Sequence, residues 1–536
     1  MNKSYQFPPI YLLEKRQINE NNREEVLDEQ QKNKNLIIKT LLDYKIPIQS
    51  IEATIGPSIT LYEIVPAKGV RINHILKYEN DIANSLESLC GRIIAPIPGT
   101  ERIGIEIPNR TPETVTIRSV IASEKFAEAR RIMHLPMAIG ATVSRDFFIQ
   151  DLSRMPHLLI AGAPGQGKSI LINSIILSLI YSLSPDDLKF ILIDPKMVEF
   201  TAYNKICKQY LAKIKGSDIT GYSGVITDFA QAKYALYSLC SEVDNRYDLL
   251  LKANCHSIND YNAKLREGKL SNDNAHRHLP YLVLIIDEFA DLILIDKEMK
   301  ILIARIAPKA RAVGIHVIIA THRSSADVIS GLIKMNFPDR AAFRVTSMTD
   351  SKIILDCPGA NQLIGCGDML FQTNGFVTRV QGAFTDTPDV ENVCDWISNN
   401  AICTEQYYLP ENALPNDVST PEIDKRDPLF EEVARYIVTQ HTASTSALQR
   451  RFSIGYNKAV KIMDQMEANG IVGPSQGPKP RKVLVDLCHI ETLLGSERHN
   501  CDDAHCDEHS HKSQKANCIK RLCDRIRNFL NKKKRL

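Results

Sequence analysis

Residues 162–169 constrain the fold of this chain more than any other segment. They read Gly-Ala-Pro-Gly-Gln-Gly-Lys-Ser and match the pattern G-x-x-x-x-G-K-[ST]. An apolar run at residues 157–161 precedes them and predicts a strand, and a longer apolar stretch at residues 170–183 follows and predicts a helix. A glycine-rich turn between a strand and a helix can wrap its N–H groups around a phosphate, which the positive end of the helix dipole also attracts. The segment therefore predicts a phosphate-binding loop.

Different residues of this loop are expected to bind different parts of a nucleotide and its metal ion. Lys168 is expected to reach the β- and γ-phosphates of ATP, and Ser169 is expected to ligate Mg²⁺. The alternative is a glycine-rich surface loop without a ligand. The predicted nucleotide-binding residues of the loop are Gly162, Ala163, Pro164, Gly165, Gln166, Gly167, Lys168 and Ser169.

Residues 281–288 complete the prediction of a catalytic site. They read Tyr-Leu-Val-Leu-Ile-Ile-Asp-Glu, a continuous apolar run typical of a parallel strand that is buried on both faces, followed by two carboxylates. Asp287 is expected to hold Mg²⁺, and Glu288 to orient and deprotonate the attacking water. A solvated pair that caps the next helix is the alternative. Together with the loop, the pair predicts hydrolysis rather than binding alone, with Lys168, Asp287 and Glu288 as the catalytic residues.

The composition is that of a soluble globular protein with several domains. The chain has 536 residues, enough for about three or four domains, with 44% hydrophobic residues, 24% charged residues and a net charge of +3. It contains no run of 18 apolar residues that would span a bilayer, and its N-terminus does not read as a signal peptide. Its 13 cysteines are therefore expected to be reduced thiols in a cytoplasmic protein.

The patterning divides the first 405 residues into two domains. Residues 1–130 mix short helices with alternating strands and predict a small α+β domain. Residues 131–405 alternate apolar strands with helices and predict an α/β domain with a largely parallel, doubly wound sheet. Its expected strands are residues 157–161, 190–194, 281–287, 315–321 and 341–346. Functional residues should cluster beyond the carboxyl ends of these strands. The candidates at those ends are Lys168, Asp194, Asp287, Glu288 and Thr321.

The C-terminal part of the chain adds a linker and a third domain. Residues 406–427 are rich in proline and acid and predict an extended linker. Residues 428–487 carry three helical patterns and a hairpin, which fit a winged helix whose third helix enters the major groove of double-stranded DNA. Asn457, Lys458 and Lys461 are the expected DNA-binding residues. A winged helix that binds protein is the alternative.

Several further motifs are specific to one family. They are Arg154-Met-Pro-His-Leu-Leu-Ile-Ala-Gly, Ile193-Asp-Pro-Lys-Met, Leu279-Pro-Tyr, Asp287-Glu-Phe-Ala-Asp-Leu, Lys309-Ala-Arg-Ala-Val-Gly-Ile-His, Gly365-Cys-Gly-Asp-Met-Leu and Ile454-Gly-Tyr-Asn-Lys-Ala. With them, residues 8–486 resemble the FtsK/SpoIIIE family of DNA translocases. The resemblance implies an N-terminal α domain, a RecA-like P-loop motor and a winged-helix γ domain, assembled as a hexameric ring on double-stranded DNA. It also implies ATP and Mg²⁺ as cofactors and a role in chromosome partition, cell division or DNA transfer.

The sequence departs from the family pattern at three points. Family members commonly begin with membrane-spanning helices, whereas this chain begins almost directly at the α domain, which implies a soluble or accessory translocase. The family usually has Gln after the fourth motor strand, where this chain has His322 after Thr321. Thr321 and His322 are both expected to bind the nucleotide, His322 as a hydrogen-bond donor. Alternatively, His322 is a core or capping residue. Lys458 and Lys461 stand where arginines are frequent, and lysine lacks the bidentate fork for guanine.

The resemblance also implies an arginine that reaches ATP from the neighbouring subunit of the ring. Arg311, Arg323 and Arg340 are the candidates, and each could instead face DNA or support the fold. The sequence alone does not choose among them.

Residues 488–536 lie beyond the resemblance. Their first half is dense in cysteine and histidine, with the spacing Cys-x₄-Cys at Cys501/Cys506 and again at Cys518/Cys523. This spacing favours a His-rich segment without metal, and a metal site is the alternative. Residues 519–530 predict a basic amphipathic helix that suits a membrane surface, nucleic acid or a partner protein.

Two other functions remain as alternatives. ATPases of protein-secretion systems share FtsK/SpoIIIE-type domains but lack a C-terminal winged helix, so residues 428–486 argue against that class. A DNA-binding adaptor could carry a weak or vestigial motor, but the intact Lys168, Asp287 and Glu288 argue against it.

Overall fold

In a computed structural model, the chain folds as two compact units, Met1–Leu414 and Pro415–Leu536. The residues that the structure describes are 5–15, 23–70, 75, 77–78, 81–82, 84, 92–94, 97, 100, 102–214, 224–270, 276–400, 405–411, 429–440, 443–452, 454, 459, 462–463, 465–467, 471–473 and 481–485. The predicted DNA-binding residues Asn457, Lys458 and Lys461 and the predicted tail, residues 488–536, lie outside this set.

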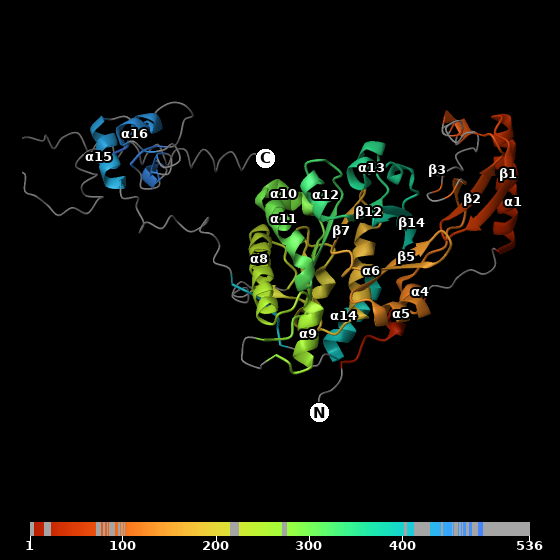
Figure 1. The fold of residues 1–536 in the computed structure, drawn as a ribbon, viewed down its shortest axis with the longest axis horizontal. Coiled ribbons are helices and arrows are strands. Elements are labelled where there is room, and N and C mark those ends of the chain that lie inside the picture. The colour runs from red at the N-terminus through yellow and green to blue at the C-terminus, as the bar shows by residue number, and fades with distance from the viewer. Residues whose placement is uncertain are drawn as a thin grey trace, which may run out of the picture. The chain divides into compact units, whose positions relative to one another are not determined.

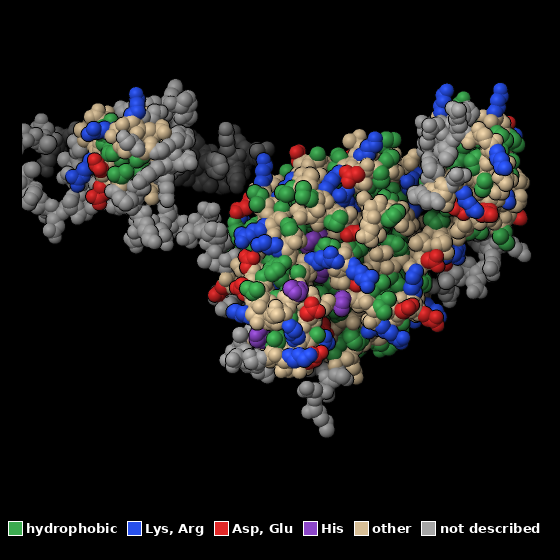
Figure 2. Space-filling view, viewed as in Figure 1, with side chains coloured by type: hydrophobic (Ala, Val, Ile, Leu, Met, Phe, Trp, Pro, Cys, Tyr) green, Lys and Arg blue, Asp and Glu red, His purple; other side chains and the backbone are tan. Residues whose placement is uncertain are grey.

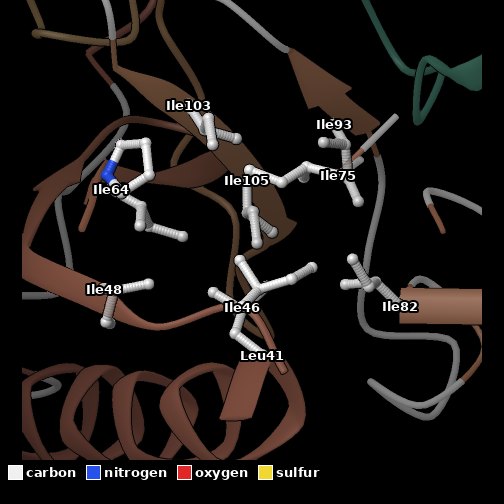
Figure 3. A pocket seen from close by; sticks show the side chains of 10 residues that line it. Leu41, Ile46, Ile48, Ile64, Ile75, Ile82, Ile93, Ile103 and Ile105 are labelled. Carbon is white, nitrogen blue, oxygen red and sulfur yellow. The ribbon is translucent and has the colours of Figure 1, made fainter. Parts of the chain in front are cut away.

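An antiparallel sheet and a long helix form the described part of the N-terminal domain (Figure 1). Alternate residues of its second strand, such as Tyr62 and Ile64, are buried because successive strand side chains point to opposite faces. Apolar side chains from the helix and strands converge on a cavity of about 10 Å³, no larger than one water molecule (Figure 3). The elements are α1 (Arg23–Asp43), β1 (Ile48–Ile55), β2 (Ile59–Pro66), β3 (Arg92–Ile94) and β4 (Ile103–Pro108), with strand order β1-β2-β4-β3. The α+β prediction is confirmed.

A mixed sheet forms the centre of the motor domain (Figure 1). It has nine strands in the order β6-β5-β14-β13-β12-β7-β11-β10-β8. Strands β8, β10, β11, β7 and β12 run parallel and are the five expected strands. Strands β13, β14, β5 and β6 extend the sheet with antiparallel pairs, which the sequence pattern does not predict. The strands are β5 (Pro136–Thr142), β6 (Phe147–Asp151), β7 (His157–Ala161), β8 (Leu188–Ile193), β10 (Tyr281–Ile286), β11 (Ile315–Thr321), β12 (Asp339–Phe343), β13 (Asp368–Thr373) and β14 (Phe376–Gly382).

Helices pack against this sheet and against one another. Helix α6 packs on β5, α10 and α11 pack on β11, and α8 packs on α11. The helices that follow the N-terminal sheet along the chain are α4 (Ile117–Ile121), α5 (Glu124–Ile132), α6 (Lys168–Ile180), α7 (Cys207–Tyr210), α8 (Phe229–Lys252), α9 (Ile258–Arg266), α10 (Phe289–Ile295), α11 (Glu298–Ala310), α12 (Gly331–Asn336), α13 (Met348–Leu355) and α14 (Thr387–Asn400). No helix in the described part of the chain is both long and apolar enough to cross a bilayer.

The segment after the motor begins with a short pairing, and the C-terminal unit has a core of its own. Strand β15 (Tyr408–Leu409) pairs with β9 (Lys213–Ile214) of the motor domain. In the C-terminal unit, α15 (Phe430–Gln440) and α16 (Thr445–Phe452) enclose buried apolar side chains. Isolated strand bridges join Ala443 to Arg481 and Val472 to Val483. Two helices and strand pairs around one apolar core agree with the winged-helix prediction.

Candidate nucleotide-binding site

The turn between β7 and α6 has the geometry of a phosphate-binding loop. Gly167 has a φ of +113°, which residues with a Cβ rarely adopt. A Cβ on Gly162 would lie 2.6 Å from the Cβ of Phe343, and a Cβ on Gly167 would lie 3.0 Å from the Cα of Gly367. Helix α6 begins at Lys168, so the N–H groups of its first turn, which have no intrahelical partner, are available to an anion at the loop.

Lys168 folds its side chain back onto this loop. Its Nζ donates to the carbonyl oxygen of Gly162 at 3.0 Å and to that of Ala163 at 3.4 Å. Burial lowers the pKa of Lys168, and attraction to the carboxylates of Glu288 and Asp287 opposes that shift. Strands β7 and β10 both pair in parallel with β11, so the loop that follows β7 and the carboxylates that follow β10 lie at the same edge of the sheet. Phosphate oxygens would form stronger, charge-assisted hydrogen bonds with the ammonium group than carbonyl oxygens do.

Asp287 lies directly beyond the end of β10, between β8 and β11. Its N–H donates to the carbonyl oxygen of Ile193 at 3.1 Å, so strand pairing continues up to the carboxylate. Burial raises the pKa of Asp287 to about 7, and repulsion from the carboxylates of Glu199, Asp194 and Glu288 adds to the shift. A bound cation would relieve this concentration of negative charge.

The oxygen donors at this site suit Mg²⁺, which needs few protein ligands, better than a metal ion whose ligands all come from the protein. Ser169, the second residue of α6, is partly buried next to Lys168 and offers a hydroxyl, and Asp287 offers a carboxylate. Within the described residues, no group of three or more His, Cys, Asp or Glu side chains is arranged to hold a metal ion. Mg²⁺ commonly takes one or two protein oxygens and fills its other positions with phosphate oxygens and water.

Glu288 is 2% exposed, and the end of β11 holds both oxygens of its carboxylate. Thr321 Oγ1 donates to Oε1 at 2.8 Å, and the backbone N–H of His322 donates to Oε2 at 3.3 Å. The Nδ1 of His322 also hydrogen-bonds to Oε2. Because β10 and β11 are adjacent parallel strands, the residues that follow them meet at the same edge of the sheet. The structure therefore brings Glu288, Thr321 and His322 together.

Lys196 is a site residue that the sequence pattern did not single out. Its Nζ lies 3.6 Å from Oε2 of Glu288. The buried Asp194 shapes the loop that carries it, since its side chain accepts hydrogen bonds from the N–H groups of Lys196 at 3.1 Å and Glu199 at 2.8 Å. The motif Ile193-Asp-Pro-Lys-Met contained the signal, because a polar turn directly after a buried strand lies at the same edge of the sheet as the other site residues.

Three family models match consecutive parts of the chain. The FtsK alpha domain matches residues 7–109, the FtsK/SpoIIIE family matches residues 116–326, and the Ftsk gamma domain matches residues 424–486. The chain belongs to the FtsK/SpoIIIE family.

Curated relatives named DNA translocase FtsK are similar along most of the chain. The relative from Chlorobaculum tepidum is 41% identical over 493 residues, which is 90% of this chain and 59% of that protein. The relative from Staphylococcus aureus (strain Mu50) is 39% identical over 495 residues, which is 91% of this chain and 60% of that protein. The chain thus spans about three fifths of the length of these relatives. A solved structure of the pCW3 conjugation coupling protein TcpA with ATPγS is 22% identical with a TM-score of 0.46, covering 68% of this chain and 99% of that one.

His322, which replaces the Gln usual in the FtsK/SpoIIIE family, holds the carboxylate of Glu288 in this structure. A carboxylate only accepts hydrogen bonds, so the Nδ1 of His322 must carry the proton. The side chain is 29% exposed and therefore does not belong to the core. The ring places a neutral or positively charged donor on Glu288, a function that a Gln amide could also perform.

The three candidate arginines have different surroundings. Arg340 is 7% exposed, and its guanidinium is committed within the chain, including a hydrogen bond to Asp356 at 2.6 Å. Arg323 is about half exposed, and it follows Thr321 and His322 at the end of β11. Arg311 is exposed after the end of α11 and lines a cavity of about 510 Å³ where β10 and β11 begin.

The family motif Gly365-Cys-Gly-Asp forms a turn against the phosphate-binding loop. The N–H of Gly367 donates to the carbonyl oxygen of Gln166 at 3.0 Å, and a Cβ on Gly365 would lie 2.5 Å from Oε1 of Gln166. The side chain of Asp368 accepts a hydrogen bond from the N–H of Ile364 at 2.9 Å and so closes the turn. The turn therefore supports the loop from the side of β13.

Proposed function

We propose that this chain hydrolyses ATP and uses the energy to move along double-stranded DNA. The observation that carries the proposal is the convergence of Lys168, Asp287 and Glu288 in a chain that contains all three FtsK domain types. A site that only bound nucleotide would not need a buried glutamate oriented by hydrogen-bond donors on both carboxylate oxygens. The curated relatives, named DNA translocases, support the same assignment.

In the proposed mechanism each residue acts from its observed position. Lys168 exchanges the loop carbonyl oxygens for the β- and γ-phosphates of ATP. Ser169 and Asp287 would hold Mg²⁺, which would neutralise developing charge on the phosphates. Glu288 orients the attacking water and accepts its proton, while Thr321 and His322 fix the direction of its carboxylate.

We further propose that the motor works as a homo-hexameric ring in which Arg311 completes the ATP site of the neighbouring subunit. Arg311 is exposed, whereas Arg323 lies beside its own site with Nη2 3.8 Å from Asp291 and the guanidinium of Arg340 is enclosed by its own chain. An arginine supplied by a neighbouring subunit would stabilise the charge of the transition state. Arg311→Ala should therefore abolish hydrolysis by the ring without loss of nucleotide binding, and both quantities can be measured on the same preparation.

DNA reading is assigned to the C-terminal domain. The proposed domains are residues 1–130, the motor 131–405, the linker 406–427, the winged helix 428–487 and the tail 488–536. Among the described residues of the motor domain on the face in Figure 2, Lys and Arg side chains are interspersed with Asp and Glu and form no single basic patch there. Asn457, Lys458 and Lys461 are proposed to contact the major groove.

The protein would act in the cytoplasm, with residues 519–530 as a contact to a membrane surface or a partner.

The test of the proposed function is ATPase activity on linear duplex DNA with free ends and with ends blocked by streptavidin. A translocating motor should be stimulated by both substrates and should displace streptavidin. Lys168→Ala should abolish hydrolysis and displacement while the far-ultraviolet circular dichroism spectrum is retained, because the hydrogen bonds of the amine go to carbonyl oxygens of the loop. Hydrolysis that duplex DNA does not stimulate, without streptavidin displacement, would contradict the proposal.

A further inference from the structure

Three charged side chains are buried together where the N-terminal sheet meets the motor sheet. Glu106 on β4, Asp368 at the start of β13 and Arg379 on β14 are 2%, 1% and 7% exposed. Arg379 Nε and Nη2 donate to the two carboxylate oxygens of Asp368 at 3.0 and 2.6 Å. Arg379 Nη1 donates to Oε2 of Glu106. One guanidinium therefore joins a carboxylate of the N-terminal domain to a carboxylate of the motor.

The burial of this ion cluster makes its geometry difficult to change. Burial disfavours the charge of Arg379, but attraction to Asp368 and Glu106 outweighs it and raises the pKa of Arg379. A buried guanidinium that loses one partner keeps an uncompensated charge, which is strongly unfavourable. The planar fork of Arg379 also fixes the direction of each carboxylate that it binds.

Asp368 connects the ion cluster to the turn at residues 364–367. Its Oδ2 accepts a hydrogen bond from the N–H of Ile364 at 2.9 Å, and its own N–H donates to the carbonyl oxygen of Gly365 at 3.0 Å. The side chain that Arg379 orients is thus the same one that closes the turn. A rotation of the Asp368 carboxylate would break the hydrogen bond to Ile364.

The turn at residues 364–367 contacts the phosphate-binding loop through backbone atoms. Gly367 donates its N–H to the carbonyl oxygen of Gln166 at 3.0 Å and accepts at its own carbonyl oxygen from the N–H of Gly382 at 2.8 Å. A Cβ on Gly167 would lie 3.0 Å from the Cα of Gly367, so no side chain separates the two segments. Close-packed backbones transmit a displacement directly, since there is no flexible group between them to absorb it.

We infer that Glu106, a residue of the N-terminal domain, is a positioning residue for the nucleotide site. Through Arg379 and Asp368 it holds the turn that supports the phosphate-binding loop, so the docking of the N-terminal sheet sets the nucleotide affinity of the motor. The inference rests on the proposed function, because it requires that the phosphate-binding loop binds nucleotide. Linkage requires the reverse effect as well, so bound nucleotide must stabilise the contact of β4 with the motor.

The test compares Glu106→Gln with the matched control Glu63→Gln in the full chain. Glu63 lies on β2 of the same sheet and pairs with Arg102 of that domain, at 3.4 Å. A fluorescent ATP analogue is titrated into each protein. The midpoint of the titration reports only on folded molecules, because an unfolded fraction lowers the amplitude and leaves the midpoint unchanged. Glu106→Gln should raise Kd about fivefold, Asp368→Asn should raise it further, and Glu63→Gln should leave it unchanged.

Hydrogen exchange of the β4 amides gives the reciprocal readout. ATPγS should slow their exchange in the wild type and in Glu63→Gln, and it should do so less in Glu106→Gln. Equal midpoints for Glu106→Gln and Glu63→Gln would overturn the inference, even if Glu106→Gln lowered the melting temperature, because a purely structural role changes stability alone. A wild type that binds no ATP analogue would overturn the proposed function together with this inference.

Discussion

Two groups of buried acids in the described part of the chain have opposite electrostatic balance. At the end of β10, Asp287 and Glu288 lie in a carboxylate-rich site, and the pKa of Asp287 rises to about 7. Between β4, β13 and β14, Glu106 and Asp368 share the guanidinium of Arg379, whose pKa the two carboxylates raise. The negative charge around Asp287 and Glu288 is neutralised by the protein only in part. The negative charge of Glu106 and Asp368 is neutralised by the guanidinium of Arg379, which is hydrogen-bonded to both.

This difference separates residues that act on a ligand from residues that fix how segments of the chain meet. An excess of buried negative charge costs stability, and such a cost is usual where a cation and a reacting group must be received. A compensated cluster gains little net stability over an apolar core, but it fixes which surfaces meet. The two groups should therefore respond in opposite ways when a charge is removed.

The largest expected effect is on hydrolysis, at the acid-rich site. Glu288→Gln should lower the ATPase rate about 10²–10⁴-fold while ATP binding is kept, because the amide cannot accept the proton of water. Glu267→Gln, an exposed glutamate paired with Lys269, is the control and should be unaffected. The two rates are measured with duplex DNA at saturating ATP. If Glu288→Gln kept more than a tenth of the wild-type rate, another group would have to be the base.

The next largest effect should be on stability, at the compensated cluster. Arg379→Met should lower the free energy of unfolding by about 3–5 kcal/mol, since it leaves two buried carboxylates without a cation. The triple variant with Glu106→Gln and Asp368→Asn should recover much of this loss, because no uncompensated charge remains. Urea titrations followed by circular dichroism measure both. A triple variant less stable than Arg379→Met would show that packing, and not charge balance, governs this interface.

The strands around the acid-rich site are the part of the molecule that the sequence predicts well. Strands 157–161 and 315–321 have the predicted bounds because both are continuous apolar runs, buried on both faces. Parallel strands place their carboxyl ends at one edge, so Lys168, Glu288 and Thr321 meet once the strands are known. Local pattern and topology together are enough for this site.

The compensated cluster could not be predicted in this way. Glu106 and Arg379 are 273 positions apart, and nothing in the local pattern of either strand marks its charge as buried. Strands β13 and β14 also lack the long apolar runs of the parallel strands, because neither is fully buried along its length. The motif Gly365-Cys-Gly-Asp identified the right segment, but its contact with the phosphate-binding loop follows only from tertiary structure.

A smaller effect should appear in the pH dependence of stability without Mg²⁺ and nucleotide. The folded pKa of Asp287 is raised from its ordinary value of 3.8 to about 7, so the folded state binds the proton more tightly than the unfolded state. The resulting stability is complete below about pH 4 and is lost as the pH rises through about 7. Asp287→Asn removes this loss, so its melting temperature should exceed that of the wild type increasingly from pH 5 to pH 8, by an amount equivalent to about 1 kcal/mol or more.

The control for this prediction is the same pH series with Arg379→Met, whose melting temperature should stay below that of the wild type throughout. Adding Mg²⁺ and ATPγS should raise the wild-type melting temperature most at pH 8, where Asp287 is ionised. An Asp287→Asn variant that melted below the wild type at pH 8 without ligand would contradict the view that this site is electrostatically unfavourable when empty of cations.

The smallest effect should come from His322, which contacts Glu288 in the acid-rich site without being one of its acids. His322→Gln should change the ATPase rate by less than about threefold, because the amide N–H can replace Nδ1–H on the Glu288 carboxylate. His322→Ala should lower the rate about tenfold, since one carboxylate oxygen loses its side-chain donor. Steady-state rates of both variants against the wild type decide between the two donors. If His322→Gln lowered the ATPase rate as much as His322→Ala does, the orientation of Glu288 would require the imidazole ring itself. The chemistry of this site would then differ from that of family members that carry glutamine.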